Sequence, residues 1–246
     1  MSRRTALLGA VALVALVAAA ALWFVGRDSP DAVDIDRAVA DAAAADAADG
    51  ASAPDAADAP AGPMDVSGTW TVDTEWIAFD AATGAGTWVG YRIDEELSGV
   101  GAYTAVGRSP RVEGAIVIDG ERVLEAEIRA DLQGLVSDNA NRDGRVRPLF
   151  ADRPVVFTLA EPIDFGGVPE EGQRITASAQ GVLRIGEVQR DIVVELSADV
   201  AGDRLVVTGS TVVMLAEFDV VVPSAPVVLS VSDEATIELQ LYLRQG

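Results

Sequence analysis

The chain has 246 residues, with 39 acidic side chains against 18 basic ones, and every basic residue is an arginine. Because histidine, cysteine and lysine are all absent, the composition excludes a Ser-His-Asp triad, a Cys-His pair, a zinc site of nitrogen or sulfur ligands, and lysine Schiff-base chemistry. The formal net charge of −21 argues against nucleic acid as a partner, since phosphates require a basic surface.

The N-terminus carries an uncharged run from Thr5 to Gly26, rich in Ala, Val and Leu, which follows Arg3 and Arg4. At about 1.5 Å per residue the run is long enough to cross the hydrocarbon of a bilayer, and the two arginines favour a cytoplasmic N-terminus. The sequence therefore predicts a single-pass membrane anchor over residues 1–27, with the remainder extracytoplasmic. A cleaved secretory signal is the alternative, because Ala18–Ala20 offers small residues for cleavage.

Residues 28–64 have a different composition, with nine aspartates, four prolines and fifteen alanines. No apolar face recurs with helical spacing, and the like charges repel one another. We expect this segment to be a disordered tether that lifts a domain off the membrane.

Residues 65–246 form one predicted domain, in which apolar and polar residues alternate almost throughout. In the segment 123–132, for example, Leu124, Ala126 and Ile128 alternate with charged residues. Such segments are typical of strands with one buried face, and we expect eight to ten of them. Only residues 138–150 break the alternation, which predicts a turn and a short helix. Periodicity alone allows either a closed antiparallel barrel or a sandwich.

Two motifs contain residue types that could carry out chemistry. Asn139, Asn141, Asp143 and Gly144 have the spacing that opens an EF-hand loop, but Phe150 occupies the position that needs a bidentate glutamate. We expect no metal site there and no cofactor. Glu125 and Glu127 could form a carboxylate pair of the glycosidase kind, but they share the strand face that points to water.

Several segments resemble the YceI-like family, in particular its membrane-anchored, actinobacterial-looking members. The resemblance rests on the order and spacing of residues 90–95, 105–110, 112–114, 130–132, 137–143, 157, 179–186 and 217–218. It implies an all-β domain: an extended eight-stranded antiparallel lipocalin-like barrel with one short helix, whose apolar lumen binds an amphiphile such as a polyisoprenoid. Residues 72–87 are longer than the usual connection in the family, and we expect them to cover one end of the barrel.

Alternation along the strands then predicts which side chains face the lumen and could bind the ligand. They are Tyr91, Ile93, Tyr103, Ala105, Ile116, Ile118, Ile128, Phe157, Leu183 and Leu239.

An arginine cluster, Arg142, Arg145, Arg147 and Arg153, lies beside the one segment that is not a strand. Since a connection between strands lies at a barrel rim, we expect Arg142, Arg145 and Arg147 to bind the polar head group of the ligand through forked hydrogen bonds. The alternative is local pairing with neighbouring aspartates, which would make the cluster structural.

The predicted function is non-enzymatic binding, storage or transport of an amphiphilic, isoprenoid-type lipid at the cell membrane. Two other classes stay open. One is a structural or adhesion module whose barrel core is filled by side chains, and the other is a carboxylate-dependent hydrolase. The structural or adhesion module differs from a lipid-binding protein in one observable feature: side chains fill its lumen, whereas a lipid-binding barrel leaves an apolar cavity of ligand size.

Overall fold

A computed structural model describes residues 29–48, 50, 65–167, 172–222 and 228–246. The predicted anchor over residues 1–27 lies outside these ranges, and within them no helix is long and apolar enough to span a membrane. The elements, in chain order, are α2 (Ile35–Ala48), β1 (Gly68–Asp73), β2 (Trp88–Leu97), β3 (Gly101–Ser109), β4 (Val112–Asp119), β5 (Arg122–Ala130), η1 (Leu132–Gly134), β6 (Val136–Ser137), α3 (Ala140–Val146), η2 (Arg147–Phe150), β7 (Val155–Leu159), β8 (Ile163–Asp164), β9 (Ile175–Ile185), β10 (Val188–Ala201), β11 (Arg204–Met214), η3 (Leu215–Phe218), β12 (Val228–Val231) and β13 (Glu234–Gln245).

The predicted closed antiparallel barrel is confirmed. Eight strands follow one another around it in the order β1-β4-β5-β7-β9-β10-β11-β13, and pairing of β1 with β13 closes the ring. The alternative of a sandwich is thereby excluded. The closing pairs run from Trp70 opposite Gln245 to Asp73 opposite Tyr242. Closure pairs the two strands that would otherwise be the edges of an open eight-stranded sheet.

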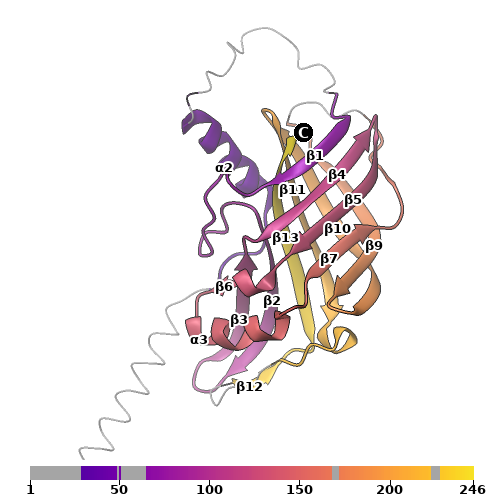
Figure 1. Cartoon of the computed structure of the whole chain (residues 1–246). Helices are drawn as coiled ribbons and strands as arrows, with labels where there is room; N and C mark the ends of the chain where they lie inside the picture. Colours follow the sequence, from indigo (N-terminus) through magenta and orange to yellow (C-terminus); the bar gives the residue numbers. More distant parts are fainter. Residues whose placement is uncertain (1–28, 49, 51–64, 168–171, 223–227) are drawn as a thin grey trace, which may run out of the picture.

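Strand β13 is longer than its contact with β1, and its other half pairs with β2 over Thr236–Gln240. Strands β3 and β6 continue the sheet beyond β2, and β12 pairs with the far end of β2. The barrel is therefore extended at one end by a flap of strands (Figure 1). We call this the α3 end, because α3 lies there together with β12 and the tip of the β2–β3 hairpin; the opposite end, beside α2 and the C-terminus, is the α2 end.

Strict alternation fails at one place in β5. The strand pairs with β4 in regular register up to Val117 opposite Glu125, but the next pair is Ile118 opposite Val123. Leu124 is the extra residue of this β-bulge and is exposed to solvent. The sequence prediction that Leu124 faces inward is therefore wrong, because a bulge reverses the alternation before it.

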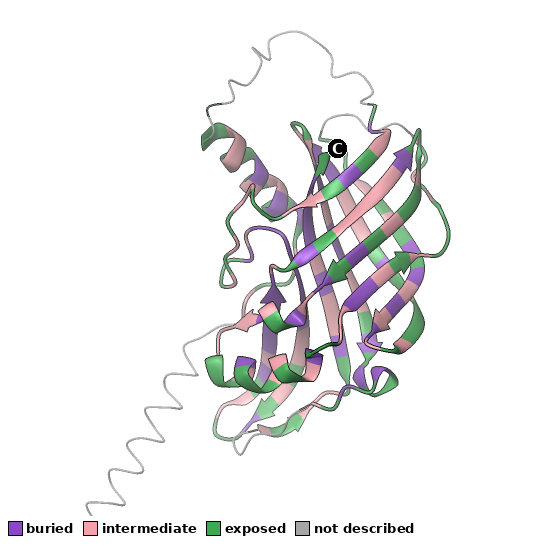
Figure 2. Ribbon diagram, viewed as in Figure 1, coloured by how far each residue is buried: buried purple, intermediate pink, exposed green. Residues whose placement is uncertain are grey.

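The described residues contain two α-helices, α2 and α3, where the sequence predicts one short helix besides the membrane anchor, and α2 corrects the prediction for residues 28–64. Residues Ile35–Ala48 form α2 rather than a disordered tether. The carboxylate of Asp34 accepts a hydrogen bond from the Arg37 N–H at 2.9 Å and so caps the helix. Ala38 and Ala42 are 0% exposed and pack with Val206 of the barrel wall, and Figure 2 shows the buried stripe along α2.

The residues before α2 and those after β1 cover the outer wall of the barrel. We call residues 29–34 the strap: the Pro30 carbonyl accepts a hydrogen bond from Arg92, and the Asp31 carbonyl accepts one from Arg108. In the segment between β1 and β2, the Gly84 carbonyl accepts a hydrogen bond from the Gln240 amide. Residues 74–87 thus lie against the outer face of β13, and the expectation that residues 72–87 cover one end of the barrel is wrong.

The strap buries charged side chains between itself and the outer face of the sheet. Glu238 is only 2% exposed; its Oε1 accepts the Val33 N–H at 3.2 Å and lies 3.9 Å from the Arg92 Nε. Its Oε2 has no hydrogen-bond partner among the described residues. Burial raises the pKa of the Glu238 carboxyl, against the opposing influence of the Val33 N–H, Arg92 and Arg108.

This raised pKa predicts how Glu238 affects stability. The Glu238 carboxyl group makes its full contribution to the free energy of unfolding below its unfolded-state pKa near 4.5. This contribution is lost as the pH rises through the higher pKa of the folded state. We therefore expect the free energy of unfolding of Glu238→Gln, relative to wild type, to increase as the pH rises from about 4 to about 8. Urea unfolding across this range measures it. Glu234→Gln, an exposed position on the same strand, is the matched control, and identical trends for the two variants would contradict the assignment.

Candidate functional site: two apolar cavities in the barrel

The barrel interior holds two cavities. The α3-end cavity has a volume of about 1210 Å³, including space open to solvent, and is lined by apolar side chains of β2, β9 and β13 and of the helical segments α3, η2 and η3. Its polar lining residues gather on one side and are Glu95, Asn139, Asn141, Arg142 and Arg145. A cavity with an apolar body and a few convergent polar groups is typical of a small-molecule site.

The α2-end cavity has a volume of about 1040 Å³ on the same measure. It lies within the closed ring, between inward side chains of β4, β5, β7, β9, β10, β11 and β13. Only Gln173 and Asp199 among its lining residues are polar. This cavity is therefore suited to a hydrocarbon chain and offers little to a charged group.

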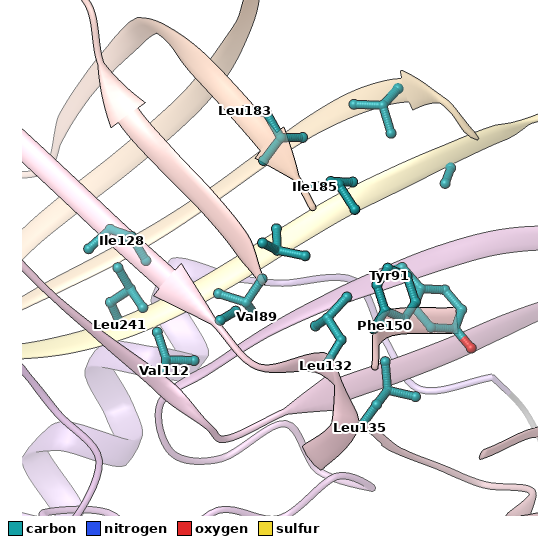
Figure 3. Packing of buried hydrophobic residues seen from close by; sticks show 14 of the residues in the cluster. Val89, Tyr91, Val112, Ile128, Leu132, Leu135, Phe150, Leu183, Ile185 and Leu241 are labelled. Carbon is teal, nitrogen blue, oxygen red and sulfur yellow. The ribbon is translucent and has the colours of Figure 1, made fainter. Parts of the chain in front are cut away.

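The two cavities follow one another along the barrel. Leu183 of the α3-end cavity lies directly opposite Phe157 of the α2-end cavity in the sheet, and Val89 is likewise opposite Leu239. Figure 3 shows side chains at this boundary, among them Val89, Ile128, Leu183 and Leu241, directed into the interior from different strands. The arrangement is an elongated apolar lumen rather than a single round pocket.

Three inward-facing glycines keep the lumen wide. At Gly181 a Cβ atom would collide with the ring of Phe157, and at Gly107 it would collide with Tyr91 and Leu135. At Gly209 it would meet the side chain of Leu196. In each case a side chain of a neighbouring strand occupies the space that a Cβ atom would need. The wall is smooth at these points because the glycines have no side chain.

The structure places nine of the ten predicted lumen residues on the cavity walls. Tyr91, Ile93, Ala105 and Leu183 line the α3-end cavity, and the α2-end cavity is lined by Ile116, Ile118, Ile128, Phe157 and Leu239. Tyr103 lines neither: it packs in a small separate cluster with Leu97 and Ala105 and donates a hydrogen bond from its hydroxyl to Asp138 at 2.6 Å. Burial is the main cause that raises the pKa of the Tyr103 hydroxyl, and the hydrogen bond to Asp138 is the second.

Arg142 is held by the protein at the edge of the α3-end cavity. Its guanidinium donates to Asp138 at 2.7 Å and to Glu95 at 3.4 Å, and its side chain is 12% exposed. Burial by itself would lower the pKa of Arg142, but the carboxylates of Glu95 and Asp138 outweigh it and raise the pKa. The paired arrangement matches the structural alternative for this residue.

The other arginines of the cluster differ in their roles. Arg147 donates from Nε to the Leu135 carbonyl at 2.6 Å and lines neither cavity, and Arg153 donates to the Phe218 carbonyl at 2.8 Å. Arg145 is exposed, lines the α3-end cavity and has no hydrogen-bond or ion-pair partner within the described ranges. The predicted head-group set thus divides into Arg142 and Arg145 at the cavity and Arg147 away from it.

Sequence reasoning missed the part of the lining that does not come from strands. Val146 of α3, Leu149 and Phe150 of η2, and Leu215 and Val220 around η3 all face the α3-end cavity. Alternation gives no information in these segments, because a helical turn does not have a period of two. The only signal in these segments that could have indicated lining residues is a short group of apolar residues next to charged ones.

The two chemical motifs have structural explanations. Asn139 caps α3, its side chain accepting from the N–H groups of Asn141 and Arg142, and Asp143 accepts from the Ser137 hydroxyl. No group of three potential metal ligands occurs in the described part of the chain. Glu125 and Glu127 are exposed on the outside of β5, where no desolvation prepares a carboxyl group for acid catalysis.

A closed eight-stranded barrel with an elongated apolar interior defines a class of small-molecule binding barrels. Within it, the chain belongs to the YceI-like domain family, whose model matches residues 89–243.

A solved structure shares this fold, and two others show weaker similarity. A polyisoprenoid binding domain from Saccharophagus degradans, implicated in plant cell wall breakdown, superposes with a TM-score of 0.53 and is 14% identical, over 72% of this chain and 98% of that one. BcnA from Burkholderia cenocepacia is 15% identical over 63% of this chain and 95% of that one, with a TM-score of 0.46. The YCEI protein of Campylobacter jejuni is 13% identical over 57% and 84%, with a TM-score of 0.45. No curated protein sequence matches the chain.

The glycine positions give a test of the lumen. Gly181→Ala should displace the Phe157 ring into the α2-end cavity, lower the free energy of unfolding by about 1–3 kcal/mol and weaken binding of the apolar probe 1-anilinonaphthalene-8-sulfonate. Gly144→Ala in α3, where a Cβ atom meets open space, is the control and should be neutral or stabilising by about 0.5–1 kcal/mol. Urea unfolding and probe titration measure both variants. Unchanged probe binding by Gly181→Ala would show that the probe does not enter this cavity.

Proposed function

We propose that this protein binds, stores or transports an amphiphilic, isoprenoid-type lipid and has no enzymatic activity. The lipid chain lies along the two cavities, and its polar head is at the α3 end. The N-terminal residues 1–27 anchor the protein in the cell membrane, with the barrel on the extracytoplasmic side.

One observation carries this proposal: polar lining groups are concentrated at the α3 end of an otherwise apolar, elongated lumen. Strand β13 has 12 residues, which corresponds to a length of about 40 Å at about 3.3 Å per residue. A long apolar chain with one polar end fits this distribution of surface, whereas a compact polar metabolite would leave buried polar groups without partners.

The comparisons support the same class of ligand. The chain belongs to the YceI-like family, and the structure from Saccharophagus degradans with the same fold is described as a polyisoprenoid binding domain. On the inner wall of β9, the small residues Ala177 and Ala179 next to Gly181 leave room along the lumen for an apolar chain.

The two alternative functions are less consistent with the geometry. A structural or adhesion module with a filled core needs no cavity, whereas the interior of this barrel contains two apolar cavities. A carboxylate-dependent hydrolase needs two acids facing one substrate, and Glu125 and Glu127 instead point into solvent from one strand.

Native extraction tests the proposed ligand. The full chain, purified from membranes in mild detergent, should carry a co-purifying lipid that organic extraction and mass spectrometry identify as an isoprenoid. Ala105→Trp, which fills the α3-end cavity at a 1% exposed position, should lose most of that lipid. Phospholipid alone in both preparations, in equal amounts, would contradict the proposal.

The head group can be tested at Arg145, which lines the α3-end cavity and has no partner among the described residues. Arg145→Gln should weaken binding of a polyprenyl phosphate about tenfold, the equivalent of one charge-assisted hydrogen bond, and leave the uncharged polyprenol unaffected. Fluorescence displacement measures both affinities. Arg147→Gln is the matched control: because Arg147 supports the Leu135 carbonyl, its loss should lower stability and affect both ligands alike. Equal losses for Arg145→Gln would retire the head-group assignment.

A further inference from the structure

The first described residues are fixed to the barrel close to the α3 end. The Ser29 hydroxyl donates to the Thr104 carbonyl of β3 at 2.6 Å, and the next two carbonyls, of Pro30 and Asp31, accept from Arg92 and Arg108. Thr104 is the fourth residue of β3, so it lies about 10 Å from the tip of the β2–β3 hairpin at 3.3 Å per residue.

Very little chain separates this attachment from the predicted membrane span. The uncharged run ends at Gly26, and only Arg27 and Asp28 precede Ser29. Three residue steps reach at most about 11 Å. A span that ends at Gly26 therefore holds the barrel beside the bilayer, with the β2–β3 hairpin end nearest to it.

The same end carries the exposed apolar side chains. Val221 is 79% exposed and Leu229 is 66% exposed, although their neighbours Val220, Val222 and Val228 line the α3-end cavity. Of the large hydrophobic residues that are exposed in the described part of the chain, only Leu124 lies toward the α2 end; Met214, Val212 and Val193 lie on the wall adjoining η3. Apolar side chains grouped beside a cavity mouth mark an interaction surface.

We propose that the α3 end docks on the surface of the lipid bilayer through Val221 and Leu229, so that the α3-end cavity opens toward the membrane. This inference rests on the proposed membrane anchor and lipid ligand. The contact is apolar rather than electrostatic, because the charged residues next to the patch, Glu217, Asp219 and Asp233, would be repelled by anionic head groups.

A small patch is sufficient for docking in this arrangement. Two aliphatic side chains alone bind a bilayer weakly, but the short connection from the anchor makes docking intramolecular and raises the effective concentration of the patch at the surface. A lipid could then move between bilayer and cavity without its apolar chain crossing bulk water, which would be costly for a long hydrocarbon.

The absence of cysteine permits a direct measurement. Leu229→Cys and Leu124→Cys are matched labelling sites, since both replace an exposed leucine and they lie toward opposite ends of the barrel. The full-length chain, labelled with bimane and reconstituted in phosphatidylcholine vesicles that contain spin-labelled phosphatidylcholine, should show fluorescence quenching at least threefold stronger at position 229. Adding Val221→Asp to the Leu229→Cys chain should remove most of this difference, and so should a 30-residue Gly/Ser insertion between Asp28 and Ser29.

Each other outcome has a separate meaning. Equal quenching at the two sites, or stronger quenching at position 124, overturns the docking proposal and leaves the lipid-binding function intact. A full chain that does not partition into vesicles overturns the anchor and the docking proposal together. Strong quenching at position 229 from a chain that yields no isoprenoid on extraction supports docking and retires the proposed ligand.

Discussion

The fold depends on the divided edge of β13. This strand pairs with β11 along one edge, and its other edge pairs first with β2 and then with β1. Its C-terminal half closes the ring, while its N-terminal half carries the flap that widens the α3 end. Because backbone groups in a sheet need partners, the point at which β13 changes partner determines where the closed ring stops and where the lumen opens. The polar edge of the site at the α3 end follows from this division, because Glu95 lies on β2 of the flap.

The inward-facing residues of the strands could be predicted from the sequence because the other face of each strand is exposed to solvent. Ala126, Ile128 and Leu239 alternate with polar neighbours and lie on the cavity wall. The alternation could not reveal the bulge at Leu124, since an extra residue changes the inward face without changing the composition. It also assigned Tyr103 to the lumen, although the flap turns that residue toward Asp138.

Helix α2 was not predictable by the same reasoning for a physical reason. The face that it buries consists of Ile35, Ala38 and Ala42, and alanine, which is common on every side of this segment, marks no direction. What selects the buried face is the close approach that alanine permits: the Ala38 carbonyl accepts a hydrogen bond from the Tyr242 hydroxyl at 2.9 Å. Partners 204 residues apart in sequence leave no local pattern. The polar side of the lumen was predictable as an arginine cluster, but which arginine is unpaired depends on the positions of Glu95 and the Leu135 carbonyl.

The position of the strap has a consequence for the order of folding. Residues 29–48 contact β2, β3, β10, β11 and β13, and β1 completes the ring only by pairing with β13. This segment, which is synthesised before the barrel strands, therefore has no complete binding surface until β13 is in place. Such non-local pairing makes folding slow, because the entropy of closing long loops is lost before the contacts form. The high aspartate content of this segment suits it to the time before the barrel has formed, because a charged, alanine-rich peptide remains soluble without a binding partner.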